Sequence, residues 1–300
     1  MPAKRSRVTC YSKLCVQRSH VVIIRGQDPI ESTVKALEMI RQEALPRIST
    51  GKPVMVKPNL INAQPPSTGI TTDGGVVEGV VKFLRQNNIE NIIIGEGSGF
   101  ADTFEAFKAT GMDKVAEKWN VKLVDLNRDA FVEVHPPNPL ALRRVKVAKT
   151  ALESTIISVP KLKVHRLATV TLGLKNMMGA LAHKGTMHNG HLSKNIVDLA
   201  SVLRPKLTVI DGIIAGEVHE TSGNPIRMDI IIAGVDPVAV DAVGAAVMGI
   251  NPEAVDHLVQ AEKKGLGTCR LENIEILGEG IDKVKRNFRR SLISRILSSL

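Results

Sequence analysis

Histidine and lysine side chains are concentrated in one stretch of the chain that contains no acidic residue. Like charges repel one another, and an unpaired imidazole or ammonium group is costly to bury, so a purely structural segment rarely gathers them in this way. We therefore predict that this stretch forms the wall of a pocket for a negatively charged molecule. It contains Lys161, Lys163, His165, Lys175, His183, Lys184, His188 and His191.

The first half of this stretch has residue types suited to acid–base chemistry. Lys161, Lys163 and His165 alternate, so they share one face if the chain is extended there. Imidazole titrates near neutral pH and nearby lysines lower its pKa, so we predict that His165 is the acid–base catalyst. Lys163 and Lys175 would stabilise a developing oxyanion, whereas Lys161 and Asn176 would bind the substrate. The alternative is that Lys161 and Lys163 pair with carboxylates elsewhere in the chain.

The second half has a pattern that a divalent metal ion can use. His183, His188 and His191 are spaced by five and three residues, and Asp211 or Glu217 could complete four ligands. This spacing matches no zinc signature. The alternative is a loop whose histidines bond to the backbone.

The three cysteines allow a further metal hypothesis. Cys10, Cys15 and Cys269 could hold an iron–sulfur cluster or zinc, which would imply a redox partner. An odd count gives no closed disulfide framework, and a ferredoxin cysteine signature is absent. Three free thiols are the alternative.

Strand and helix patterns alternate about four times over the first 126 residues, which predicts an α/β fold. We expect a mostly parallel central sheet with helices on both faces and with ligands beyond the carboxyl ends of its strands. Expected strands span 20–26, 53–62, 91–99 and 121–126, and expected helices span 29–46, 74–87 and 102–119.

Polar residues follow two of these strands, where a parallel sheet places its ligands. Lys57 and Asn59 follow one strand, and Glu96 and Ser98 follow the next, so we predict that all four contact the substrate. The turn GEGSG (95–99) is expected either to bind an oxyanion on its N–H groups or to need glycine for a positive φ.

The rest of the chain predicts more of the same architecture. An inserted hairpin is expected around 128–150, and residues 20–280 form either one domain or two lobes of about 20–150 and 151–280. Further strands are expected at 154–163, 207–212, 228–234 and 273–278, helices at 166–180, 193–203 (with Ser193 as N-cap), 236–249 and 251–267, and a polar loop at 213–227.

The basic residues lie mainly at the two ends. The net charge is +10, but the leader 1–19 and the tail 281–300 carry most of it, and the tail is expected to form an amphipathic helix. Such ends could contact nucleic acid or a ribosome. No apolar run is long enough for a transmembrane helix, so the expected location is the cytoplasm.

Four segments together resemble the DUF362 family, a group of prokaryotic proteins of undefined activity. They are VMVKPNL (54–60), GEGSG (95–99), PKLKVHRLATVTLGLKNMMG (160–179) and DPVAVDAVGAAVMG (236–249), and the resemblance covers roughly residues 20–280. Many relatives carry ferredoxin-type cysteines and are described as iron–sulfur proteins. This chain has no ferredoxin module, so the resemblance implies the fold more strongly than the cluster.

Three functional hypotheses follow. The first is a cytoplasmic, enzyme-like protein that binds a small carboxylate or phosphate and uses Lys and His for acid–base chemistry. The second is an iron–sulfur or metal-binding redox accessory protein. The third is a nucleic-acid or ribosome-associated factor that uses its basic ends.

Overall fold

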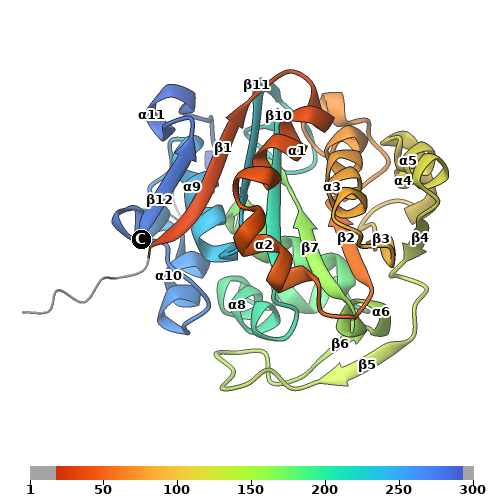
Figure 1. Ribbon diagram of the computed structural model, residues 1–300. Coiled ribbons are helices and arrows are strands. Elements are labelled where there is room, and N and C mark those ends of the chain that lie inside the picture. The colour runs from red at the N-terminus through yellow and green to blue at the C-terminus, as the bar shows by residue number, and fades with distance from the viewer. Residues whose placement is uncertain (1–17, 293–300) are drawn as a thin grey trace, which may run out of the picture.

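A twisted sheet runs through the whole molecule (Figure 1). The computed structural model describes residues 18–292. The strand order is β12-β1-β11-β10-β7-β2-β3-β4, while β8 pairs with β10 and β9 pairs with β8. The strands are β1 (Ser19–Arg25), β2 (Val54–Pro58), β3 (Ile92–Glu96), β4 (Lys122–Asp125), β7 (Thr155–Val159), β8 (Lys161–His165), β9 (Thr169–Thr171), β10 (Leu207–Gly216), β11 (Pro225–Gly234) and β12 (Ile274–Gly278).

The sheet is mostly parallel, as the sequence predicted. Along the main path only β11 runs against its neighbours, pairing antiparallel with both β1 and β10. Strands that are covered on both faces need continuous apolar runs, and VVII in β1 and III in β3 and β11 supply them. β1 lies between β12 and β11, so the first and the last strand of the described chain are neighbours in the sheet.

Helices cover both faces, which confirms the α/β prediction. In Figure 1, α1, α2 and α3 lie in front of the sheet, and their apolar side chains belong to one hydrophobic cluster, while α8 and α9 belong to a second. The α-helices are α1 (Pro29–Met39), α2 (Arg41–Ile48), α3 (Gly74–Gln86), α4 (Thr103–Ala109), α5 (Met112–Trp119), α6 (Lys149–Glu153), α7 (Gly173–Asn176), α8 (Leu192–Val202), α9 (Pro237–Val247), α10 (Asp256–Lys263) and α11 (Ile281–Val284).

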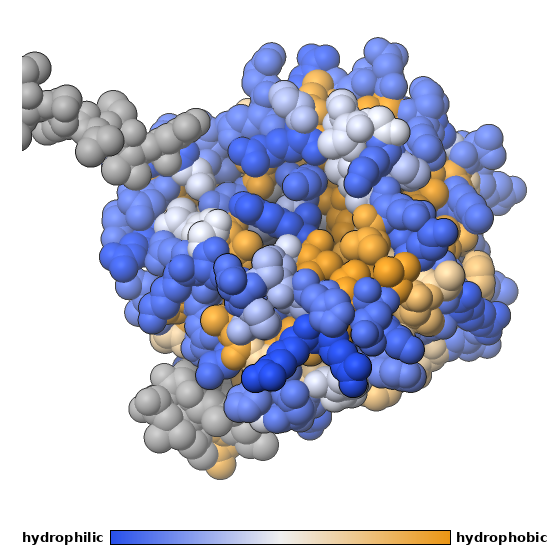
Figure 2. Space-filling view, turned by 90° about the horizontal axis from the view of Figure 1, so that it is seen from below, coloured by the Kyte–Doolittle hydropathy of each residue, from blue (hydrophilic) through white to orange (hydrophobic). Residues whose placement is uncertain are grey.

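The inserted hairpin is present as a separate two-stranded sheet. It consists of β5 (Phe131–Val134) and β6 (Val145–Ala148), which pair antiparallel. The hairpin and α8 lie at the bottom of Figure 1, and the view from below in Figure 2 shows a mostly hydrophilic surface with apolar side chains gathered around a central hollow.

None of the helices between residues 18 and 292 is both long enough and apolar enough to cross a membrane.

Four local expectations differ from the structure, three of them between residues 166 and 227 and the fourth in the C-terminal tail. Residues 166–180 form a turn, β9, the short α7 and the 3-10 helix η2 (Met177–Ala180), because the chain folds back on β8 as a hairpin. The polar loop expected at 213–227 is shorter and spans 217–224, since residues 213–216 belong to β10 and residues 225–227 to β11. Helix α8 is preceded by His191, so Ser193 is not its N-cap.

The C-terminal tail also differs from the expected single helix. Helix α11 ends at Val284, and the chain then runs along the body, where Val284 and Phe288 are buried in the core. Backbone bonds from Arg286 N to Val247 O and from Phe288 N to Met248 O hold this segment. These bonds to α9 and the residue after it are incompatible with continued helical pairing within the tail.

Candidate functional site: a cation-lined cavity

A cavity of about 420 Å³ lies where the segments that follow β2 and β3 meet β8, α7 and the loop between β10 and β11. This is the edge at which parallel sheets place their ligands. The wall includes the 3-10 helix η3 (Lys184–His188) as well. Its polar lining residues are Asn59, Glu96, Lys163, His165, Arg166, Thr171, Lys175, Asn176, Lys184, His188, His219, Glu220 and Thr221.

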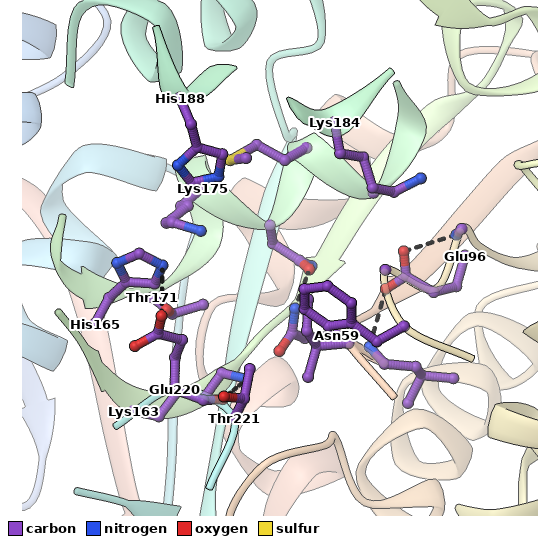
Figure 3. A pocket seen from close by; sticks show the side chains of 18 of the residues that line it. Asn59, Glu96, Lys163, His165, Thr171, Lys175, Lys184, His188, Glu220 and Thr221 are labelled. Carbon is purple, nitrogen blue, oxygen red and sulfur yellow. Dashed lines mark hydrogen bonds and ion pairs between the residues drawn. The ribbon is translucent and has the colours of Figure 1, made fainter. Parts of the chain in front are cut away.

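Lys163 projects from β8 into one side of this cavity (Figure 3). Its Nζ donates to the carbonyl oxygens of Ile70 (2.7 Å) and Glu220 (3.2 Å). Burial, followed by the charges of Lys175 and Lys161, lowers the pKa of Lys163 to about 7. The amine is therefore partly neutral under physiological conditions, and a bound anion would raise its charge again.

His165 is held in one tautomer by the turn that follows β8. Its Nδ1 accepts hydrogen bonds from the backbone N–H groups of Leu167 and Ala168, each at 3.1 Å, so the ring proton sits on Nε2. Nε2 lies 3.5 Å from Oε1 of Glu220. Burial, followed by the charges of Lys175 and Lys163, lowers the pKa of His165. At neutral pH the ring is an uncharged donor, and neither nitrogen offers a free lone pair to act as a general base.

Lys175 extends from α7 and lies beside His165 in Figure 3. Its Nζ forms no hydrogen bond or ion pair with any residue between 18 and 292, although the carboxylate of Glu220 influences it electrostatically. Burial lowers the pKa of Lys175 to about 8. An ammonium group that is partly withdrawn from water and lacks a partner is costly, so Lys175 is a candidate ligand-binding residue.

The opposite side of the cavity contains a closed polar network. Nζ of Lys57 donates to Oε1 of Glu96 at 2.8 Å, and both side chains are buried. Asn176 Oδ1 accepts from Lys57 Nζ and from Asn59 Nδ2, each at 3.3 Å. Lys57 thus lies behind the wall and neutralises Glu96, whereas Oδ1 of Asn59 is buried and has no partner within residues 18–292.

The glycines of GEGSG serve close packing. A Cβ atom on Gly97 would lie 2.4 Å from the carbonyl oxygen of Gly179, and one on Gly179 would lie 2.0 Å from Oε1 of Glu96. Positive φ angles occur at other glycines. The N–H groups of Gly97, Ser98 and Gly99 donate to Glu96, Thr103 and Ile61. The expected oxyanion cradle and the expected positive φ were therefore both wrong.

Three predicted substrate contacts, Lys57, Lys161 and Ser98, lie outside the cavity wall. Lys161 is fully buried, and its Nζ bonds to Oδ2 of Asp211 at 2.6 Å, as the alternative interpretation proposed. Ser98 is buried beside the wall, and its Oγ has no partner within the described chain. Asn59, Glu96, Lys163, His165, Lys175 and Asn176 do line the same cavity.

The predicted metal ligands do not come together. Across residues 18–292, no three His, Cys, Asp or Glu side chains are arranged to hold a metal ion, so the structure does not bring His183, His188 and His191 together as ligands. His188 lines the cavity, and His191 is exposed. Cys269 is buried against Glu262, with its Sγ 3.5 Å from Oε2. The other two cysteines, Cys10 and Cys15, lie outside the described residues, as do residues 1–17 of the basic leader and 293–300 of the tail.

Several polar lining residues were not predicted as site residues, and three of them are Glu220, Lys184 and Thr171. Glu220 belongs to the segment assigned as a polar loop, and its carboxylate contacts both His165 and Arg166. Lys184 donates to Asn127 Oδ1 at the far wall. Thr171 is 4% exposed, and its Oγ1 has no partner within residues 18–292. The sequence signal that could have identified Glu220 as a site residue was a charged residue in the segment that follows a strand.

The C-terminal segment holds the loop that carries Glu220. Oε2 of Glu217 accepts a bond from Arg289 N at 2.7 Å, the two side chains form an ion pair, and Val218 N donates to Arg289 O at 2.8 Å. Val218 has a φ of 68°, which is costly for a β-branched residue. The next three residues line the cavity. The tail therefore fixes one wall of the site.

Replacing Glu217 by Ala should loosen this wall. We expect faster amide exchange at residues 217–221, and a loss of about 1–3 kcal/mol of stability from the missing acceptor. Hydrogen–deuterium exchange resolved by mass spectrometry measures the first effect. Glu253→Ala, at an exposed position away from this loop, is the control. Unchanged exchange at 217–221 would contradict the role given to the tail.

The fold and the cavity together define an α/β protein with a cation-rich site at the carboxyl edge of its sheet. The sequence pattern of the family called Domain of unknown function (DUF362) matches residues 54–246, so the chain belongs to this family. It is also similar to a thylakoid-associated protein of Synechocystis sp., with 23% identity over 235 residues, which is 75% of this chain and 72% of that protein.

Proposed function

We propose that the cavity binds a small anionic molecule, a carboxylate or a phosphate, and that the protein acts on it as an enzyme. The observation that carries this proposal is Lys175, a partly buried lysine that lines the cavity and whose amine has no partner in the described chain. An anionic oxygen would supply the missing partner and form a charge-assisted hydrogen bond.

The charge balance of the wall supports an anion. Four cationic side chains and two carboxylates line the cavity, and Glu96 is already neutralised by Lys57 behind it. The remaining carboxylate, Glu220, contacts Arg166 at 3.2 Å. Lys163, Lys175 and Lys184 therefore exceed the available negative charge, and the Nε2–H of His165 adds a neutral donor.

Apolar lining indicates that the ligand is more than an inorganic ion. Leu60, Ile61, Phe100 and Met178 line the cavity together with the polar residues. Phe100 is 76% exposed in the structure, which is unusual for a large aromatic side chain. We infer that a short carbon skeleton contacts these side chains while its charged end reaches the lysines.

The proposal predicts that small anions bind and that Lys175→Ala weakens them. Hydrogen bonds to charged groups contribute about 1.5–3 kcal/mol, so affinity should fall at least about tenfold. Isothermal titration calorimetry with a panel of small monocarboxylates, dicarboxylates and phosphate esters measures this. Lys194→Ala, on the exposed side of α8, is the matched control. Absence of binding across the panel, or equal affinity in Lys175→Ala, would refute the proposal.

Anion affinity should also depend on pH in a defined direction. The pKa of Lys163 is lowered to about 7 and that of Lys175 to about 8, so both lysines lose their charge as the pH rises through this range. Affinity is expected to be highest below pH 7 and to fall progressively by pH 9, with proton uptake on binding. Titrations in buffers of different ionisation enthalpy measure the uptake. A flat profile from pH 6 to pH 9 contradicts this assignment.

A further inference from the structure

Lys175 differs from the other lysines that line the cavity. Lys163 donates to two carbonyl oxygens, and Lys184 donates to Asn127 and to Leu181 O. Lys175 has none of these bonds among residues 18–292, so its nitrogen is free to approach a ligand atom at close range. An anionic ligand would pair with the protonated form of Lys175, whereas attack on a carbonyl carbon requires its uncharged amine.

The surroundings of Lys175 favour the free amine. Burial lowers its pKa to about 8, so about a tenth of the amine is uncharged at pH 7, whereas an unperturbed lysine with a pKa of about 10.4 is almost fully protonated. Uncharged lysine is the nucleophile that forms Schiff bases. The attacking nitrogen must lose a proton and the carbonyl oxygen must gain one. The carboxylate of Glu220 can transfer this proton, and the Nε2–H of His165, on the same side of the cavity, can donate a hydrogen bond to the oxygen (Figure 3).

We propose that Lys175 forms a Schiff base with the carbonyl carbon of a 2-oxo acid. This inference rests on the proposed function, because the carboxylate of such a substrate would occupy the anion site. Lys163 lies on the same side, and its charge interacts with that of Lys175. One lysine would hold the carboxylate while the other reaches the adjacent carbon. Thr171 Oγ1, buried and unpartnered within the described chain, supplies a hydroxyl for the carbonyl oxygen.

The reaction balances with water and one proton. The lone pair of Nζ forms a bond to the carbonyl carbon, and the π electron pair moves to the oxygen. Glu220 takes a proton from the nitrogen and delivers it to that oxygen, giving a carbinolamine. A second proton, supplied by a hydronium ion or a buffer acid, allows the hydroxyl to leave as water while the nitrogen pair forms the C=N bond. One amine, one carbonyl and one proton thus give one iminium ion and one water.

Reductive trapping tests this inference on the full chain. The protein is incubated with pyruvate or 2-oxoglutarate and sodium cyanoborohydride, and peptides are analysed by mass spectrometry. We expect one adduct per chain, located on Lys175, to form at least about tenfold faster than adducts on exposed Lys194, since more of the buried amine is uncharged. Trapping should accelerate as the pH rises towards 8.

Lys175→Arg separates this inference from anion binding. Arginine keeps the positive charge but cannot form the Schiff base, so the adduct should disappear while calorimetry still detects anion binding. Lys194→Arg should trap normally. Equal labelling of all lysines, or an adduct that persists in Lys175→Arg, would overturn the inference. If anions bind but 2-oxo acids leave no adduct on Lys175, the inference fails and the proposed function stands.

Discussion

Replacing Lys161 by Ala should destabilise the protein by about 3–5 kcal/mol. The substitution leaves the carboxylate of Asp211 fully buried without its cation, although the carboxylate keeps bonds from Asp73 N (2.7 Å) and Ile213 N (3.0 Å). The bond from Asp73 N joins β10 to the start of α3, so an uncompensated charge on Asp211 would destabilise the contact between this strand and this helix. Chemical denaturation followed by circular dichroism measures the loss.

Two comparisons show whether the buried pair is responsible. The double variant Lys161→Met with Asp211→Asn removes both charges and should recover most of the lost stability. Lys149→Ala breaks an exposed pair with Glu153 (3.8 Å) and should change stability by less than about 0.5 kcal/mol. Because Lys161 lies outside the cavity wall, the double variant should still bind anions. If Lys161→Ala is fully stable but no longer binds anions, Lys161 is a ligand-binding residue and not a structural one.

Replacing Asp241 by Ala should cost about 2–6 kcal/mol and should also weaken ligand binding. The Asp241 carboxylate is fully buried and accepts bonds from Gly173 N (2.7 Å) and Leu174 N (2.9 Å). Each buried N–H group left without an acceptor costs about 1–3 kcal/mol. These two groups begin α7, which carries Lys175 and is too short to hold its own position.

The pH dependence of stability checks this role independently. Burial raises the pKa of Asp241 to about 7, while the two N–H groups oppose that rise. The folded pKa lies above the unfolded value, so this group's contribution to stability falls as the pH rises from about 4 to about 7. Asp241→Asn should remove that slope. Asp28→Ala, at the exposed N-cap of α1, should cost only about 0.5–2 kcal/mol and leave anion binding unchanged. Equal effects of Asp28→Ala and Asp241→Ala on binding would contradict the positioning role.

The sequence alone determined the class of fold and the edge of the sheet at which the site lies. Strands covered on both faces need continuous β-branched runs, and the helices between them need a 3.6-residue period, so both can be read locally. Lys163 and His165 follow such a run, which placed them correctly in the wall. Residues 166–180 were wrongly assigned to a single helix because a short apolar run fits both a helical and a strand period.

Only the tertiary structure decided which lysine is free to bind a ligand. The sequence does not distinguish Lys57, Lys161 and Lys175, because each follows or lies in an expected element near the same sheet edge. In the structure, Lys57 pairs with Glu96 and Lys161 pairs with Asp211, and both carboxylates lie far away along the chain. The order of the strands brings those carboxylates within reach, and no local pattern encodes that order. Lys175 has no carboxylate partner in the described chain because it extends from α7 into the cavity, where we propose that a ligand pairs with its amine.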